Sequence, residues 1–302
     1  MRTAIGPEDS AFGRSPVVNA FSVDVEDYFQ VEAFKSVIHR ADWDLHPARV
    51  AASTDRMLKL LEAADVRATF FVLGWVAERF ADMVSRIEAH GHEVASHGYS
   101  HELVHAQTAS EFRQDIRHAK QLLEDIVGKQ VRGFRAPTFS IGRGNWWAYE
   151  VLAEEGYEYS SSIYPISHDL YGMESAPRTP FRPLNRDGFL EIPVTTVRLL
   201  NKNRPCAGGG YFRLLPYGVS RWCMRRVNKA DRMPCVFYCH PWEIDVDQPR
   251  IKQAPLKSQL RHYLNIREMA PRIARLLQDF SWGRIDDIYL QSGVVYQTFG
   301  GA

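Results

Sequence analysis

The sequence has few cysteines, no strong excess of either charge and no long apolar run. Its 302 residues include only four cysteines without any CxxC spacing, which argues against a zinc ribbon and predicts reduced thiols. Lys and Arg number 37 and Asp and Glu number 36, which gives a formal net charge of +1. This balance gives the whole chain no electrostatic attraction to nucleic acid or to an anionic membrane.

The N-terminus also lacks the features of a targeting signal. Pro7, Glu8 and Asp9 stand where a secretory signal would need an apolar run, and no window approaches the length of a membrane span. We therefore expect a cytoplasmic protein whose residues 1–17 form an N-terminal arm. An apolar content of 45% is enough for a large core, and α/β barrels of this length commonly form one domain.

Segments with the patterns of strands and helices alternate along the chain. The expected strands are 17–25, 67–73, 92–97, 131–137, 189–197 and 234–244, and the expected helices are 48–64, 75–90, 108–127 and 257–279. This alternation predicts an α/β fold with a parallel sheet closed as a barrel, whose chemistry lies at the C-terminal ends of the strands. Stretches 165–190 and 199–218, rich in Pro, Gly and Asn, are expected as long loops over the site.

Two histidines follow one expected strand at a spacing that suits a metal ion. His97 and His101 stand four residues apart in the run HGYSH, and two imidazoles on one turn can bind the same ion. An HxxxH pair is also common on protein surfaces. The spacing alone therefore leaves both interpretations open.

Acidic residues end the first expected strand. Alternation places Asp24 and Glu26 on the same side of this strand, whereas Asp27 begins the loop. One carboxylate could complete a metal site of two histidines and an acid, and another could take a proton from a water in that site. Acids also cluster at ordinary exposed strand ends, which is the alternative explanation.

Two further side chains follow other strand ends. Arg135, in the run FRAPT, could hold a neighbouring carboxylate in place and ionised. His240, in the run YCHPW, could protonate a leaving amine near neutral pH. A surface arginine and a core histidine bonded to a backbone carbonyl are the alternatives.

Taken together, these four motifs resemble those of the polysaccharide deacetylase family, also called NodB-like or carbohydrate esterase family four. They occur in the family's order over roughly residues 18–245. The resemblance implies an α/β fold that is a distorted (β/α) barrel of about seven strands. It also implies a catalytic domain over 18–245 and a helical C-terminal extension over 246–302 that packs on the barrel.

The resemblance assigns catalytic roles to three residues. Asp24 takes the position of the catalytic base, Arg135 orients this base, and His240 takes the position of the general acid. A backbone N–H near Thr138 could then help to stabilise an oxyanion.

The resemblance also implies a divalent metal, for which we expect zinc. His97 and His101 match the two-histidine motif and become ligands. The metal-binding acid of the family usually follows the base directly, but Val25 stands in that position here. The spacing therefore favours Glu26, and Asp27 remains a competitor.

Candidates for the substrate wall follow from the same resemblance. Three come from the arginine motif and from a motif in which serine replaces a common aspartate, namely Pro137, Thr138 and Tyr164. The other three are Tyr28, Tyr211 and Trp242. Plain core packing is the alternative for the aromatic residues. The runs DVEDYFQVEAF and GGGYFRLLP resemble deacetylases of exosortase-linked exopolysaccharide gene clusters.

The sequence therefore predicts a metal-dependent hydrolase that removes N-acetyl groups from amino sugars of an oligo- or polysaccharide during exopolysaccharide biosynthesis. One rival is a hydrolase of small cyclic amides or imides on the same fold. Another rival is a catalytically silent scaffold that binds carbohydrate. The sugar, the native metal and any association into a homo-oligomer stay open.

Overall fold

A parallel sheet forms the centre of the chain. The structure, a computed structural model, describes residues 17–169, 171–185, 188–291 and 295–300. The strands of the sheet are β1 (Val18–Val25), β2 (Thr69–Val72), β3 (Glu93–Ser96), β4 (Gly133–Phe134), β5 (Tyr159–Ser160), β6 (Leu190–Glu191), β9 (Val236–Cys239) and β10 (Ser281–Gly283). Every residue of β1 after Val18 is buried, as its β-branched and aromatic composition predicts.

The sheet curls into an irregular barrel. Its strands follow the order β10-β1-β2-β3-β4-β5-β6, β9 also pairs with β1, and all these pairs are parallel. The segment after β6 closes the barrel, because the Thr195 N–H donates to the Val236 carbonyl of β9 at 3.4 Å. The Thr195 hydroxyl in turn accepts from the Val236 N–H at 2.7 Å. The expected distorted α/β barrel is confirmed, with β10 as a short additional strand.

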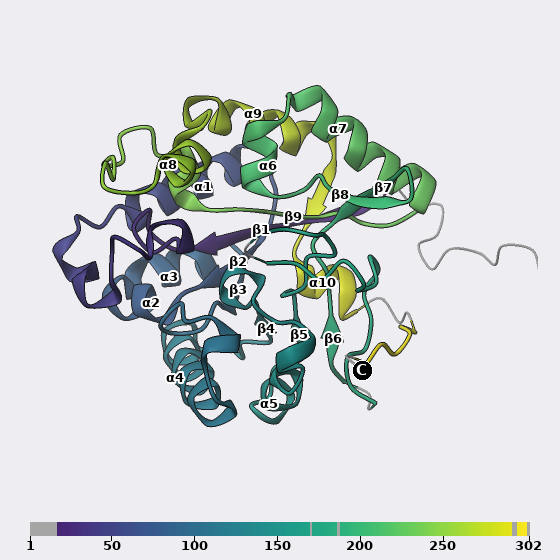
Figure 1. Cartoon of the computed structure of the whole chain (residues 1–302), viewed down its shortest axis with the longest axis horizontal. Helices are drawn as coiled ribbons and strands as arrows, with labels where there is room; N and C mark the ends of the chain where they lie inside the picture. The colour runs from purple at the N-terminus through teal and green to yellow at the C-terminus, as the bar shows by residue number, and fades with distance from the viewer. Residues whose placement is uncertain (1–16, 170, 186–187, 292–294, 301–302) are drawn as a thin grey trace, which may run out of the picture.

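Helices connect the strands and cover the outside of the barrel (Figure 1). They are α1 (Val50–Ala63), α2 (Gly74–Arg79), α3 (Ala81–Ala89), α4 (Ala109–Val127), α5 (Ala148–Glu154), α6 (Gly209–Leu214), α7 (Tyr217–Arg226), α8 (Leu256–Tyr263), α9 (Ile266–Asp279) and α10 (Ile285–Tyr289). The longest, α4, begins with a capping box between Thr108 and Glu111 and ends at Gly128 in the left-handed conformation. Among the described residues, no helix is long and apolar enough to span a bilayer.

Several segments differ from the expectation. The helix expected over 75–90 is divided at Phe80 into α2 and α3, and the strand expected over 189–197 is divided between β6 and the start of the next strand. The stretch 199–218, expected as a loop, contains α6 and the strand β8 (Lys202–Pro205), which pairs with β7 (Thr196–Leu199). The helical segment expected over 257–279 is divided into α8 and α9 at Asn265, whose φ of +52° does not fit a right-handed helix.

The C-terminal segment packs on the barrel and also contributes a strand to it. Helix α9 contacts α1 and α7, and β10 pairs with the first residues of β1. Residues 1–16 of the expected N-terminal arm lie outside the described residues. The boundary expected at residue 245 stays a prediction. All four cysteines are buried and free.

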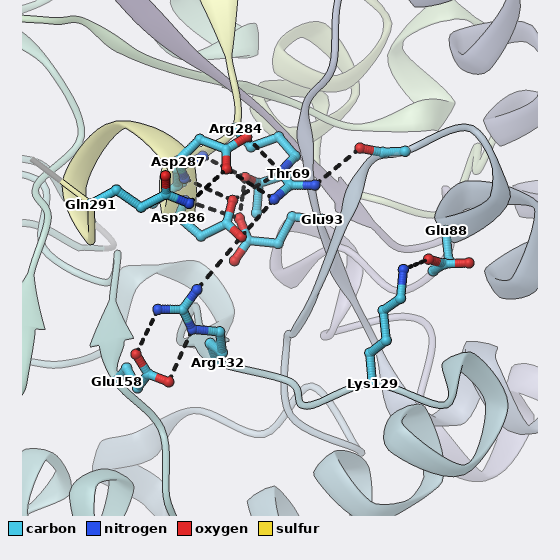
Figure 2. A network of polar contacts seen from close by, with 12 residues as sticks. Thr69, Glu88, Glu93, Lys129, Arg132, Glu158, Arg284, Asp286, Asp287 and Gln291 are labelled. Atoms are coloured by element: carbon cyan, nitrogen blue, oxygen red, sulfur yellow. Dashed lines mark hydrogen bonds and ion pairs between the residues drawn. The ribbon is translucent and has the colours of Figure 1, made fainter.

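Polar side chains close the end of the barrel at which the strands begin (Figure 2). The Thr69 hydroxyl donates to the Glu93 carboxylate at 2.6 Å and accepts from the Ile285 N–H, at the start of α10, at 2.8 Å. Arg284 forms an ion pair with Asp286 at 3.0 Å, and the Asp286 N–H donates to Glu93 at 3.3 Å. These contacts hold α10 against the barrel.

Candidate active site

Functional side chains gather at the opposite end of the barrel, where the strands finish. Asp24 lies near the end of β1 and Glu26 follows it, His97 follows β3, and His240 follows β9. Because the strands are parallel, their C-terminal ends share one edge, which brings these side chains together. With His101, they line one cavity of about 330 Å³.

Arg135 fixes the carboxylate of Asp24. Its Nη1 donates to Asp24 Oδ1 at 2.6 Å and to the Ser22 hydroxyl at 2.9 Å. Its Nε and Nη2 donate to the carbonyl and hydroxyl of Ser161 at 3.0 and 2.9 Å. The guanidinium lies 4.0 Å from the centre of the Phe71 ring, and Arg135 is fully buried. These contacts hold Asp24 in one orientation beside a permanent positive charge.

Glu26, His97 and His101 form a group that could hold a metal ion. One ligand atom from each lies within 4.8 Å of the other two, and His101 Nε2 lies 2.8 Å from Glu26 Oε2. His97 Nδ1 lies 2.8 Å from the Arg135 carbonyl. When Nδ1 carries the proton and donates to this carbonyl, the lone pair of His97 Nε2 is available to an ion.

The protonation states of Glu26 and His97 suit a cation. Burial lowers the pKa of His97 to about 4, so this imidazole is neutral at pH 7. Burial alone would raise the pKa of Glu26, but the neighbouring His101 and His240 lower it to about 2, which keeps the carboxylate ionised. Ionised carboxylates and neutral imidazoles are the forms that bind divalent metals.

Asp27 lies away from this group. Its Oδ2 accepts the backbone N–H groups of Arg49 and Val50 at 2.6 and 2.9 Å, at the start of α1, and its Oδ1 accepts the N–H of Tyr28 at 2.9 Å. These bonds lower the pKa of Asp27 but burial outweighs them and raises it to about 6. The geometry thus separates the two acids that the sequence left as competitors: Glu26 faces the histidines, and Asp27 caps a helix.

His240 lines the same cavity, next to both acids. Its Nε2 lies 3.5 Å from Glu26 Oε1 and 3.9 Å from Asp24 Oδ2. Burial alone would lower the pKa of His240, but the carboxylates of Glu243, Glu26 and Asp24 raise it to about 9. The imidazole is therefore protonated at neutral pH and can donate a proton into the cavity.

Sequence reasoning missed the groups that hold His240. Glu243 Oε2 accepts the His240 backbone N–H at 3.1 Å and lies 3.7 Å from its Nδ1. Arg213 Nε donates to Glu243 Oε1 at 3.1 Å, and both of these side chains are buried. The run HPWE places an acid three residues after the histidine, at capping-box spacing, which was the available signal. Arg213 comes from α6 and gave no such local signal.

The six candidates for substrate binding divide into two groups. Three of them line the cavity: Thr138, Tyr211 and Trp242. The other three are buried outside its lining: Tyr28, Pro137 and Tyr164. Tyr28 packs edge-on against Phe29 in the main core, and Tyr164 packs edge-on against Phe139 and Tyr238. The cavity is also lined by Tyr238, which the sequence did not single out.

Family models match most of the chain in two adjacent parts. Residues 42–159 match the model described as polysaccharide deacetylase, and residues 161–290 match a domain of unknown function, DUF3473. The first part contains His97, His101 and Arg135, whereas His240 lies in the second. Asp24 precedes both parts. The site therefore draws on residues from before, within and after the first matched part.

Similar proteins of known name agree with the first match. A peptidoglycan deacetylase of Helicobacter pylori is 34% identical over 113 residues, which is 36% of either chain. A chitin deacetylase of Colletotrichum lindemuthianum is 34% identical over 96 residues, covering 30% of this chain and 39% of that protein. The chain thus spans about a third of the length of the curated relatives that it matches.

One solved structure shares the fold over nearly the whole chain. It comes from Mycobacterium smegmatis and is described as a polysaccharide deacetylase. It superimposes with a TM-score of 0.63 and 20% identity, covering 98% of both chains. The fold is therefore that of the NodB-like deacetylases, including the C-terminal segment.

Proposed function

The chain carries a polysaccharide deacetylase domain, and from this premise we propose that it hydrolyses N-acetyl groups from amino sugars of a polysaccharide with the help of one divalent metal. The observation that supports this most directly is the arrangement of Asp24, the Glu26–His97–His101 group and His240 around one cavity. The relatives named above are deacetylases of peptidoglycan and chitin, which are polymers of N-acetylated sugars.

Glu26, His97 and His101 would hold the metal. Two imidazoles and one carboxylate form the ligand set of many catalytic zinc sites, so zinc is the ion that we propose. When bound, such an ion polarises a carbonyl oxygen and lowers the pKa of a bound water. Asp27 would take no part, because its carboxylate oxygens are occupied by backbone N–H groups.

Asp24 would act as the base. Arg135 holds its carboxylate in one direction, and Asp24 lines the same cavity as the metal ligands. The carboxylate can take the proton of an attacking water as the oxygen of that water bonds to the acetyl carbon. The polar contacts of Arg135 leave Asp24 little freedom to turn away.

His240 would act as the acid. As the bond between the acetyl carbon and the sugar nitrogen breaks, His240 Nε2 can give its proton to that nitrogen, which leaves as an amine while acetate is released. Glu243 would be a positioning residue, because it contacts the imidazole and its backbone N–H but does not reach the reacting atoms.

The wall of the cavity would receive the sugar. Tyr211 can pack against the apolar face of a pyranose ring, and Thr138 and Trp242 line the same cavity. A role in exopolysaccharide biosynthesis, a cytoplasmic location and association into a homo-oligomer stay predictions.

The direct test is release of acetate from an N-acetylglucosamine oligomer by the purified full chain. We expect release that stops on chelation and returns with zinc. Asp24→Asn and His240→Ala should each lower turnover by roughly two to four powers of ten while the metal stays bound. Glu26→Ala should lose the metal, whereas the matched variant Asp27→Ala should keep it.

Two results would contradict the proposal. Full turnover by Asp24→Asn would remove its role as base. One bound metal per chain without acetate release from any N-acetylated oligomer would instead favour a small cyclic amide as substrate or a silent scaffold.

A further inference from the structure

Helix α8 presents its most apolar residues to solvent. Leu256 and Leu260 are 77% and 69% exposed, and Leu264, which directly follows the helix, is 36% exposed. These leucines recur every four residues and therefore form one stripe along the helix. A helix packed on a globular core normally turns such a stripe inward.

The inward side of α8 is polar instead. His262 is buried and stacks on Trp242, with 4.1 Å between the ring centres, and its Nε2 lies 2.6 Å from Gln248 Oε1. Tyr263 on the same side donates to the Pro249 carbonyl at 3.0 Å. Hydrogen bonds and ring stacking thus hold the helix in place, and packing against the barrel does not account for the outward leucines.

The stripe reaches the mouth of the candidate active site. Leu264 lines the cavity, and so does Leu214 at the end of α6, which is 57% exposed. We call these four side chains the leucine patch: Leu214, Leu256, Leu260 and Leu264. Helices α6 and α8 lie on the same side of the barrel in Figure 1. An apolar surface therefore begins at the opening through which a substrate would enter.

The sequence in and around helix α8 is rich in positive charges. Residues 248–267 contain no Asp or Glu and five cations, all exposed: Arg250, Lys252, Lys257, Arg261 and Arg267. One carboxylate, Asp169, pairs with both Lys257 and Arg261, at 2.8 and 3.2 Å. Two exposed carboxylates, Asp247 and Glu268, directly flank this stretch, so its cations exceed the nearby carboxylates by two, whereas the whole chain carries a net charge of only +1. The positive charge is thus concentrated beside the exposed leucines.

We propose that the leucine patch and its cations dock the protein on an anionic lipid bilayer. Leucines on one side of a helix insert at the boundary of headgroups and acyl chains, and flanking Lys and Arg attract lipid phosphates. Docking in this way turns the mouth of the cavity toward the membrane surface, where a glycan attached to a lipid would meet it. This surface goes beyond the proposed function and does not depend on the hydrolytic chemistry.

Sedimentation of the full chain with vesicles tests the docking. We expect binding to vesicles of phosphatidylcholine mixed with phosphatidylglycerol, weak binding to phosphatidylcholine alone, and loss of binding in high salt. The double variant Leu256→Ser/Leu260→Ser should bind at least about tenfold more weakly. The matched control Leu200→Ser changes a leucine that is 96% exposed on the turn between β7 and β8, and it should bind as the unaltered chain does.

Acetate release from a soluble oligomer separates this proposal from the proposed function, because neither Leu256 nor Leu260 lines the cavity. The double variant should hydrolyse the soluble oligomer as the unaltered chain does. Docking is overturned if the unaltered chain does not sediment with the mixed vesicles, or if the double variant sediments equally well. It is also overturned if the leucines instead hold two copies together, seen as a dimer that the double substitution dissociates in sedimentation velocity.

Discussion

Separating Asp24 from Arg135 should cost several kcal/mol of stability, and the effects of removing the two charges should not add. Arg135 is fully buried and Asp24 nearly so, with 2.6 Å between Nη1 and Oδ1. Either Asp24→Asn or Arg135→Met leaves one charge of this pair buried without its partner. Breaking a buried pair in this way costs about 3–5 kcal/mol of the free energy of unfolding.

The double variant Asp24→Asn/Arg135→Met should lose less stability than the two single variants lose in sum. Two unit charges about 4 Å apart attract each other by about 4 kcal/mol at an effective dielectric constant of about 20. Each single variant loses this attraction, so the sum of the two single losses counts it twice. The double variant loses it once. We therefore expect a coupling energy of at least about 2 kcal/mol between the two substitutions.

Urea unfolding of the chelated protein, followed by tryptophan fluorescence and circular dichroism, measures all four free energies. The exposed pair Arg86–Asp55, 2.9 Å apart, is the matched control, and its coupling should be below about 1 kcal/mol. Additive effects at Asp24 and Arg135, within about 0.5 kcal/mol, would refute the view that Arg135 holds the Asp24 carboxylate in place.

Two further predictions concern Glu93 and Glu243. Burial and the nearby Asp286 raise the pKa of Glu93 to about 8. Between pH 4.5, near the ordinary pKa of a glutamate, and pH 8, the unfolded chain therefore loses this proton while the folded chain keeps it. The free energy of unfolding should fall by up to about 1.4 kcal/mol per pH unit as the pH rises through this window. Glu93→Gln should flatten that slope in urea unfolding, and an unchanged slope would assign it to other groups. Glu243→Gln should lower kcat about 10- to 100-fold with KM changed less than about twofold, because it weakens the contacts that orient His240 and leaves the residues proposed to contact the sugar unchanged. An equal effect on KM, or an unaltered kcat, would count against a positioning role.

The sequence predicted the parts of this site that follow strand ends. Asp24, His97, Arg135 and His240 each stand at or just after a short apolar run, and in a parallel barrel that placement alone brings them to one edge. The local motifs were therefore sufficient to predict that these side chains meet, and the alternation of segments was sufficient for the fold.

The orientation of individual side chains could not be predicted in the same way. Glu26 and Asp27 are neighbours in sequence, and only the position of α1, whose first N–H groups take the carboxylate of Asp27, decides which acid faces the histidines. Arg213 reaches Glu243 from another element, thirty residues away in sequence. Such contacts depend on how loops and helices pack over the barrel, which no local pattern records.

The pairing of β10 with β1 has a consequence for how such a gene can change. The first family model ends at residue 159 and the second begins at residue 161, so the boundary between them falls within β5 (Tyr159–Ser160). The strand that carries Asp24 is flanked by β10 and β9 from the C-terminal region and by β2 from the N-terminal one. Recombination at the boundary between the models would cut through one barrel, so the two regions have to be inherited and exchanged together.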